Sequence, residues 1–317
     1  METRKLISFG SSSYVISIPK NWITQNRLEK GDSLYIEEKP NELVITSSGS
    51  EKQKQIKEKQ IDCAGKSFDI IKCELFAAYL NNYNIIEIRQ ISEENLPRIK
   101  ESLQNLAGLE ILEQTSDKII AKDLINIKEI SIKALMRRID IIVRSMMDDA
   151  IPSDQKFNVK GLYDRDEDVN RLTLLVRRMI TAALEDQKIS RMFETEPKDV
   201  LLDWEVAFRL EKIGDNMKRI TKCMSKLKLE DKKFSEISEI FGKLKTRYLS
   251  IMKAYYGRDI NLACSIETTK SEIYDKCDEM IQNGTQSNRQ FVVLMENFKI
   301  TNARIADIAK AVVMNCV

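Results

Sequence analysis

The feature that most constrains this fold is an apolar repeat with alternating steps of three and four residues, which runs from residue 124 onward. Such steps line up side chains on one face of an α-helix, and helices with such faces pack antiparallel in bundles. One stripe is formed by Val206, Leu210, Ile213, Met217 and Ile220. The stripes predict helices over residues 132–146, 169–183, 206–227, 234–255, 260–281 and 298–312.

Proline and glycine residues separate these helices and group them as three plus three. The breaks fall at Pro152, Pro197, Gly257 and Gly284. The third and sixth helices share a motif, because Leu210–Asp215 and Asn302–Asp307 both end in a small residue and an Asp at the same heptad phase. An internal duplication explains this pairing. We therefore predict a mainly α fold, with up-and-down three-helix bundles at residues 124–229 and 230–317.

Residues 1–49 are predicted to form a small all-β module. Its four strands lie at Leu6–Phe9, Tyr14–Ile18, Leu34–Glu37 and Leu43–Thr46. The first turn is Gly10–Ser13, the second is Lys39-Pro40-Asn41, and Pro19 opens a short helix that holds Trp22. A module of this size struggles to bury a core alone, so we expect it to need a partner.

Residues 50–123 are predicted to form a small module of the α/β class. The charged run at residues 50–60 is either a linker or an edge strand. Helix and strand alternate beyond it, with helices at Phe68–Leu80 and Ser92–Leu106, a strand at Asn84–Arg89, and a hairpin of Leu109–Glu113 with Lys118–Ala121. The module carries no recognisable chemical motif, so the sequence leaves its role open.

The composition argues against catalysis. The chain has no histidine, which removes the usual general base, the commonest metal ligand and the usual pH switch. Its six cysteines show no C-x-x-C spacing, which argues against a zinc ribbon or a thioredoxin-like redox site. We therefore expect a protein that is not an enzyme.

The sequence shows no sign of export or membrane insertion. The N-terminal residues METRKLISFG lack the long apolar run of a signal peptide, and no apolar stretch approaches the roughly 20 residues that span a bilayer. Scattered cysteines with apolar neighbours suit a reducing compartment. We expect a cytoplasmic protein without direct membrane insertion.

About the first 46 residues resemble a known family of small modules. The segment from Gly10 to Trp22, GSSSYVISIPKNW, joins a strand to Pro-Lys and a short helix, and a Gly31-Asp32 turn follows. This order of features resembles the AbrB/MazE/SpoVT swapped-hairpin family. The resemblance implies that two chains interlace their hairpins into one barrel, which is the partner that the size of the module demands.

The helical part, about residues 124–317, is similar to PhoU, the regulator that couples phosphate transport to signalling. The similarity rests on the RLEKIGD motif at Arg209–Asp215, on the upstream Asp164–Leu172 stretch, and on the three-plus-three repeat. With its AbrB-type N-terminus, the whole architecture resembles archaeal PhoU-like regulators. In that comparison the middle module is an insertion of unknown role.

Five basic side chains in the first thirty positions are the candidate DNA-binding residues. They are Arg4, Lys5, Lys20, Arg27 and Lys30. The whole chain has a net charge of only +2, so attraction for DNA must come from a local patch. Dimerisation would double this patch, and the resemblance places the basic N-terminal strand on the DNA-facing side. The alternative is a solubilising surface on a dimerisation or antitoxin-like module, because acidic Glu37, Glu38 and Glu42 cancel the charge.

Carboxylates at four-residue spacing suggest a metal site in the first helical repeat. Glu211 and Asp215 share a helix face that we expect to point away from the bundle core. The preceding helix carries Asp164, Asp166 and Asp168. Hard oxygen ligands of this kind suit Mg²⁺, Ca²⁺, Mn²⁺ or ferric iron, and the PhoU resemblance implies that such pairs can hold metal ions.

Two departures from the PhoU pattern weaken the metal interpretation. Asn170 stands where that family often has Asp, and Ala303 replaces the Glu that Asp307 would need in the second repeat. We expect no metal ion in the second repeat, and we expect that the protein requires no cofactor elsewhere. The alternative for the first repeat is an exposed face whose carboxylates pair with Lys212 and Lys218.

Trp204 and Phe208 continue the outward stripe of Glu211 and Asp215. Aromatic side chains away from the heptad seam either pack on a neighbouring domain or offer a patch for a partner. We expect them to pack on the α/β module, because soluble chains normally cover such patches.

These features favour a homodimeric regulator of phosphate uptake. Its N-terminal modules would bind DNA, and its helical part would dock a phosphate transporter or a signalling protein. One alternative is a protein-interaction regulator whose N-terminal module only dimerises. Another is a metal-dependent enzyme built on carboxylates in a helical bundle, which the missing His opposes because ferritin-like sites normally include Glu-x-x-His pairs.

Overall fold

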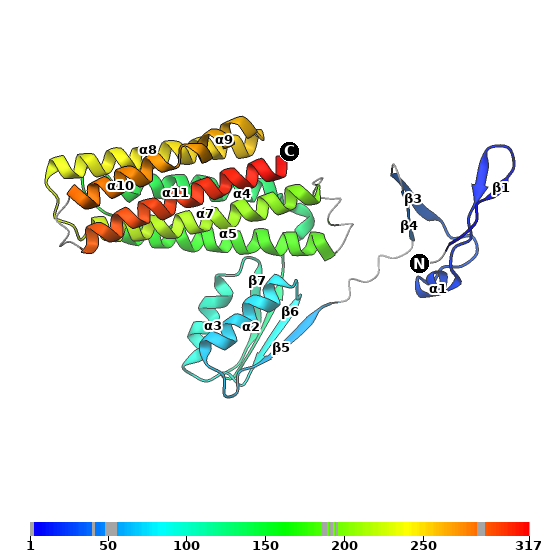
Figure 1. The fold of residues 1–317 in the computed structure, drawn as a ribbon. Coiled ribbons are helices and arrows are strands. Elements are labelled where there is room, and N and C mark those ends of the chain that lie inside the picture. The colour runs from blue at the N-terminus through cyan, green and yellow to red at the C-terminus, as the bar shows by residue number, and fades with distance from the viewer. Residues whose placement is uncertain are drawn as a thin grey trace. The chain divides into compact units, whose positions relative to one another are not determined.

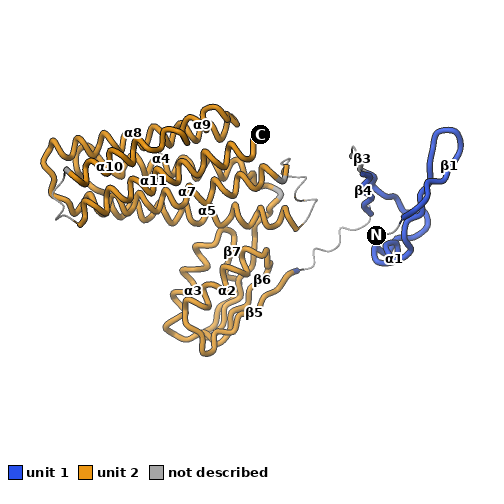
Figure 2. The backbone as a smooth tube through the Cα atoms, in the orientation of Figure 1, with its two compact units in different colours: residues 1–56 blue, residues 57–317 orange. Residues whose placement is uncertain are grey.

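The structure is a computed structural model that describes residues 3–39, 42–47, 56–185, 189, 193, 196–283 and 289–316. The chain divides into two compact units, residues 1–56 and residues 57–317 (Figure 2). No helix within the described ranges is long and apolar enough to cross a membrane.

The N-terminal unit consists of two hairpins joined by a short helix. Strands β1 (Ile7–Phe9) and β2 (Ser13–Val15) pair antiparallel, as do β3 (Leu34–Lys39) and β4 (Glu42–Ser47), and helix α1 spans Lys20–Gln25. The hairpins form separate two-stranded sheets. Both hairpins and the helix agree with the prediction, although Pro40 and Asn41 of the second turn lie outside the described residues.

The second unit begins with an α/β module. Its elements are β5 (Glu58–Asp62), α2 (Phe68–Leu80), β6 (Ile85–Arg89), α3 (Asn95–Gln104), β7 (Leu109–Gln114) and β8 (Lys118–Asp123). The strands form one sheet in the order β5-β6-β8-β7, in which β5 and β6 are parallel and the other pairs antiparallel. The predicted alternation of helix and strand is confirmed, and the charged run at residues 50–60 ends in an edge strand; residues 50–55 of that run lie outside the described ranges.

The rest of this unit is a helical bundle (Figure 1). Its helices are α4 (Ile132–Ala150), α5 (Val159–Glu185), α7 (Pro197–Met224), α8 (Asp231–Gly257), α9 (Ile260–Thr268), α10 (Ser271–Asn283) and α11 (Arg289–Cys316). The predicted seam of α7, from Val206 to Met224, is buried throughout, and one continuous apolar core joins both repeats. The prediction of a mainly helical bundle is therefore confirmed. Gly284, predicted to break the chain before the last helix, lies outside the described residues.

The fifth predicted helix, over residues 260–281, is in fact two helices, α9 and α10. The chain turns between them because polar side chains from other helices hold the backbone carbonyls at this point. Arg247 of α8 donates to the carbonyl oxygens of Ile266 (2.6 Å) and Thr269 (3.3 Å), and Asn302 of α11 donates to that of Lys270 (2.8 Å). These contacts satisfy carbonyls that a helix end leaves free.

The α/β module packs on α5 through a buried ion pair. The Arg178 guanidinium of α5 contacts the Asp123 carboxylate at the end of β8, and its Nε lies 3.2 Å from Oδ1 of Asn82. Leu174 of α5 also packs against the apolar core of the module. These contacts join the module and the bundle into one compact unit.

Candidate nucleic-acid interface and carboxylate site

All five predicted DNA-binding residues are exposed in the N-terminal unit. Lys20 is the first residue of α1, and Arg27 lies just beyond the end of that helix with a positive φ of 52°. Helix ends of this kind project side chains into solvent, where long cationic side chains can reach phosphate oxygens. The unit therefore presents basic groups on and beside its short helix.

The same unit exposes large apolar side chains that a folded monomer would bury. They are Leu6, Ile7, Phe9, Tyr14, Val15, Ile16, Tyr35, Ile36 and Leu43. None of the residues between 3 and 47 whose side chains the structure describes is buried, so these residues form no apolar core of their own. Exposed apolar surface on this scale marks an interaction site.

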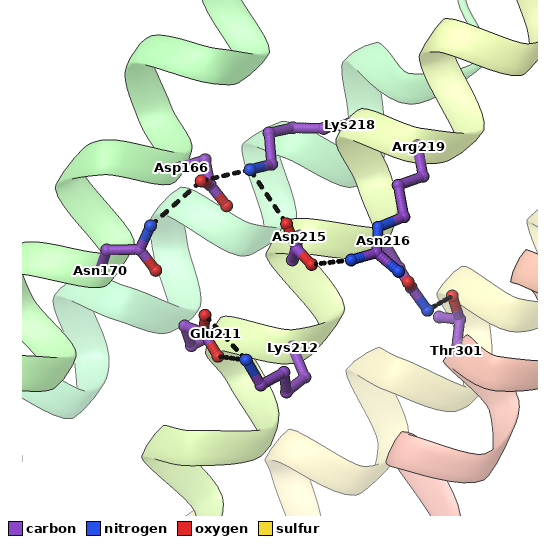
Figure 3. Close-up of polar contacts among 9 residues, drawn as sticks. All are labelled: Asp166, Asn170, Glu211, Lys212, Asp215, Asn216, Lys218, Arg219 and Thr301. Carbon is purple, nitrogen blue, oxygen red and sulfur yellow. Dashed lines mark hydrogen bonds and ion pairs between the residues drawn. The ribbon is translucent and has the colours of Figure 1, made fainter. Parts of the chain in front are cut away.

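In the helical bundle, α5 and α7 bring Asp166 and Asp215 onto either side of one lysine (Figure 3). The Lys218 Nζ lies 2.5 Å from Oδ2 of Asp166 and 3.0 Å from Oδ1 of Asp215. The Asn170 amide donates to Oδ2 of Asp166 at 3.1 Å, and Arg219 donates to Oδ2 of Asp215 at 2.7 Å. Both carboxylates are thus neutralised by cations of the chain itself.

Asp166 is the most buried member of this group, with 4% of its surface exposed. Burial raises its pKa, and the Lys218 ammonium opposes that shift. Burial would lower the pKa of Lys218, but hydrogen bonds to Asp166 and Asp215 outweigh it and the pKa is raised. Lys218 is therefore charged at neutral pH, which is the state that the two carboxylates stabilise.

The structure separates the other predicted ligands from this pair. Asp164 and Asp168 are exposed, because side chains two positions from Asp166 lie on roughly the opposite face of the helix. Glu211 is only 3.0 Å from Nζ of Lys212, and it faces that lysine in Figure 3. Within the part of the chain that the structure describes, no group of three acidic or cysteine side chains could hold a metal ion.

Trp204 and Phe208 do not pack on the α/β module, so that expectation is wrong. Trp204 packs against the core of the helical bundle, and Arg177 lies 5.3 Å above its ring. Phe208 stays 43% exposed with Lys212 at 5.4 Å. The module instead contacts α5 through Leu174.

Sequence reasoning named Lys218 only as a surface partner of carboxylates and missed the burial of Asp166. A signal for that burial was present. Leu162, Asp166 and Val169 follow the steps of four and three that mark a seam, and all three are buried. A charged residue on a seam needs a buried partner of opposite charge, and Lys218 is that partner.

The N-terminal segment matches a known family. Residues 7–53 match the model for antidote-toxin recognition MazE, bacterial antitoxin. No curated protein matches the sequence.

Two solved structures resemble the chain. PhoU from Pseudomonas aeruginosa is 13% identical with a TM-score of 0.51, over 58% of this chain and 94% of that one. The phosphate transport system regulatory protein PhoU from Streptococcus pneumoniae is 16% identical with a TM-score of 0.48, over 58% of this chain and 92% of that one. Only the first likeness is close enough to identify a fold. The helical part of the chain therefore has a PhoU-like fold, and the N-terminal segment is similar to the MazE-type module.

Proposed function

We propose that the protein is a homodimeric regulator of phosphate uptake that binds DNA through paired N-terminal units. Its helical part would dock a phosphate transporter or a signalling protein. This is a regulatory role without a chemical step, which fits a chain that has no histidine. The phosphate assignment follows from the PhoU-like fold, and the DNA assignment from the MazE-type segment.

The observation that carries the proposal is the exposed apolar surface of the N-terminal hairpins. Phe9, Tyr14 and Tyr35 are all about two-thirds exposed or more (71%, 73% and 68%) in a unit without a core. A second copy could cover these side chains by pairing with both hairpins. Burial of large aromatic and aliphatic groups contributes roughly 1.5–3 kcal/mol for each side chain, which is ample to drive association.

Such a dimer would present each basic residue twice. Lys20 and Arg27 at the ends of α1 would then form two patches related by symmetry, which suits contacts to phosphates along one duplex. Affinity from phosphate contacts falls with salt, because bound counterions are released. Salt-dependent binding is therefore the expected signature.

Replacing Lys20 and Arg27 by alanine should weaken DNA binding roughly 10-fold or more near physiological salt. The slope of log K against log salt concentration should become shallower by about 1 for each phosphate that the variant no longer touches. Fluorescence anisotropy of the full chain with its own promoter DNA, measured over a salt series, checks this.

The matched control replaces Lys222 and Lys226, two exposed lysines at the end of α7, by alanine. This variant loses the same number of charges outside the N-terminal unit and should bind DNA as the wild type does. Wild-type protein without salt-sensitive affinity for that DNA would refute the DNA-binding part of the proposal.

A second candidate is a regulator whose N-terminal dimer binds another protein. The exposed Glu38 and Glu42 on the second hairpin favour it, because acidic groups weaken the attraction for phosphates. The family model for this segment also describes antidote-toxin recognition. A tagged full-length chain, recovered from cells at high and low phosphate, separates the two. Recovery of promoter DNA from phosphate-uptake genes would support the DNA-binding regulator. Recovery of transporter subunits without DNA would support the regulator that binds another protein.

A further inference from the structure

The site between α5 and α7 already contains a cation, the Lys218 ammonium. It bonds to Asp166 and Asp215 from two different helices, and only 14% of its side chain is exposed. An ammonium held between two carboxylates occupies the position that a metal ion takes when it bridges such groups. The charge that those carboxylates need is supplied by the polypeptide.

The acceptor oxygens at this site are almost all in use. Both oxygens of Asp215 receive a cation, Oδ1 from Lys218 and Oδ2 from Arg219. Oδ2 of Asp166 receives both Lys218 and the Asn170 amide. Of the four carboxylate oxygens of Asp166 and Asp215, Oδ1 of Asp166 is the one that is buried without a hydrogen-bond partner. One free oxygen cannot hold Ca²⁺ or Mg²⁺, which take about six oxygen ligands.

The orientation of Asn170 also argues against a bound metal ion. Its amide nitrogen faces Asp166 at 3.1 Å, whereas a metal ion would require its carbonyl oxygen. The remaining predicted ligands do not compensate, since Glu211 is paired with Lys212 and Asp164 is exposed. The residues present therefore do not fit the metal site that the PhoU resemblance implied.

We propose that Lys218 is the built-in cation of this site, so that Asp166 and Asp215 bind no metal ion in the wild-type chain. The same carboxylates accept a divalent cation only when the lysine amine is removed. This inference concerns the helical bundle alone and does not depend on the proposed function.

The test compares wild type with Lys218→Met, which keeps an unbranched side chain one heavy atom shorter and removes its charge. Wild-type protein should have the same Tm in EDTA and in millimolar MnCl₂. Lys218→Met should lose about 5–10 °C in EDTA, because buried Asp166 loses the Lys218 ammonium, although Asp215 keeps its ion pair with Arg219. It should regain part of that loss in MnCl₂ and bind Mn²⁺ that electron paramagnetic resonance detects.

Two further variants make the result specific. Lys212→Met removes an ammonium from the same helix that forms an ion pair with Glu211, and it should gain no response to Mn²⁺. Asp166→Asn added to Lys218→Met should abolish the response, because it removes the second carboxylate.

Two results would overturn the inference. One is wild-type protein that holds a metal ion which Asp166→Asn removes. The other is a folded Lys218→Met that binds no more Mn²⁺ than wild type. If Lys218→Met does not fold, Lys218→Gln takes its place in the same comparison. The metal content of the wild-type protein tests the inference independently of both variants.

Discussion

Replacing Arg178 by methionine is expected to lower the free energy of unfolding by about 3–5 kcal/mol, which is a large loss for a single substitution. Arg178 is 1% exposed and its guanidinium contacts both oxygens of Asp123. Methionine would leave the Asp123 carboxylate buried without its counter-ion. Urea denaturation followed by circular dichroism measures the loss.

The surroundings of Arg178 explain why the loss is so large. Its Nε lies 3.2 Å from Oδ1 of Asn82, and its guanidinium stacks 4.6 Å from the centre of the Tyr79 ring. All of these partners belong to the α/β module, whereas Arg178 belongs to α5. The substitution therefore weakens the packing of the module on the bundle as well as the ion pair.

Arg177 is the matched control, because it is the neighbouring arginine on the same helix and is exposed. Arg177→Met removes a cation from above the Trp204 ring, so its effect should stay below about 1 kcal/mol. Asp123→Asn added to Arg178→Met should recover much of the stability, because it removes the uncompensated charge. Equal stabilities for the two arginine variants would contradict the assigned role of this ion pair.

Replacing Asp140 by alanine is expected to lower the free energy of unfolding by about 2–4 kcal/mol. The Asp140 carboxylate on α4 accepts hydrogen bonds from the Tyr248 hydroxyl at 2.8 Å and the Tyr256 hydroxyl at 3.1 Å, both on α8. It also accepts two from Arg144. Alanine would leave the hydroxyl of fully buried Tyr248 without an acceptor and would weaken the junction between the two helical repeats.

Asp148 offers the matched control, because it pairs with Lys245 across the same two helices at the surface. Asp148→Ala should change stability by about 0–1 kcal/mol, as exposed ion pairs do. Tyr248→Phe should fall between the two variants, because it removes the hydroxyl and leaves the carboxylate with its other donors. Equal effects of Asp140→Ala and Asp148→Ala in urea denaturation would show that the buried network does not join the repeats.

The helical fold could be predicted because its information is local. Apolar steps of three and four residues mark each seam, and side chains such as Leu210 and Ile213 are buried where the period places them. The hairpin turn at Gly10 could be predicted for the same reason, since its φ of +72° is one that glycine readily adopts. Local chemistry decides these features.

The contacts between distant segments could not be predicted in this way. Arg178 and Asp123 lie on different elements, and only the packing of the module on α5 brings them together. The break between α9 and α10 depends on Arg247 and Asn302, which come from two other helices. The ion pair between Asp166 and Lys218 joins α5 to α7, so it too depends on how distant segments pack.

The proposed function depends above all on the N-terminal hairpins, which should complete their core with a second copy of the chain. The decisive quantity is the molar mass of the full-length protein in solution, measured by light scattering with Phe9→Asp as a companion variant. We expect a mass of twice 36.7 kDa for the wild type. In Phe9→Asp the mass should be lower, while the helical signal in circular dichroism persists. A wild-type protein that stays at 36.7 kDa at every concentration would contradict this dimer.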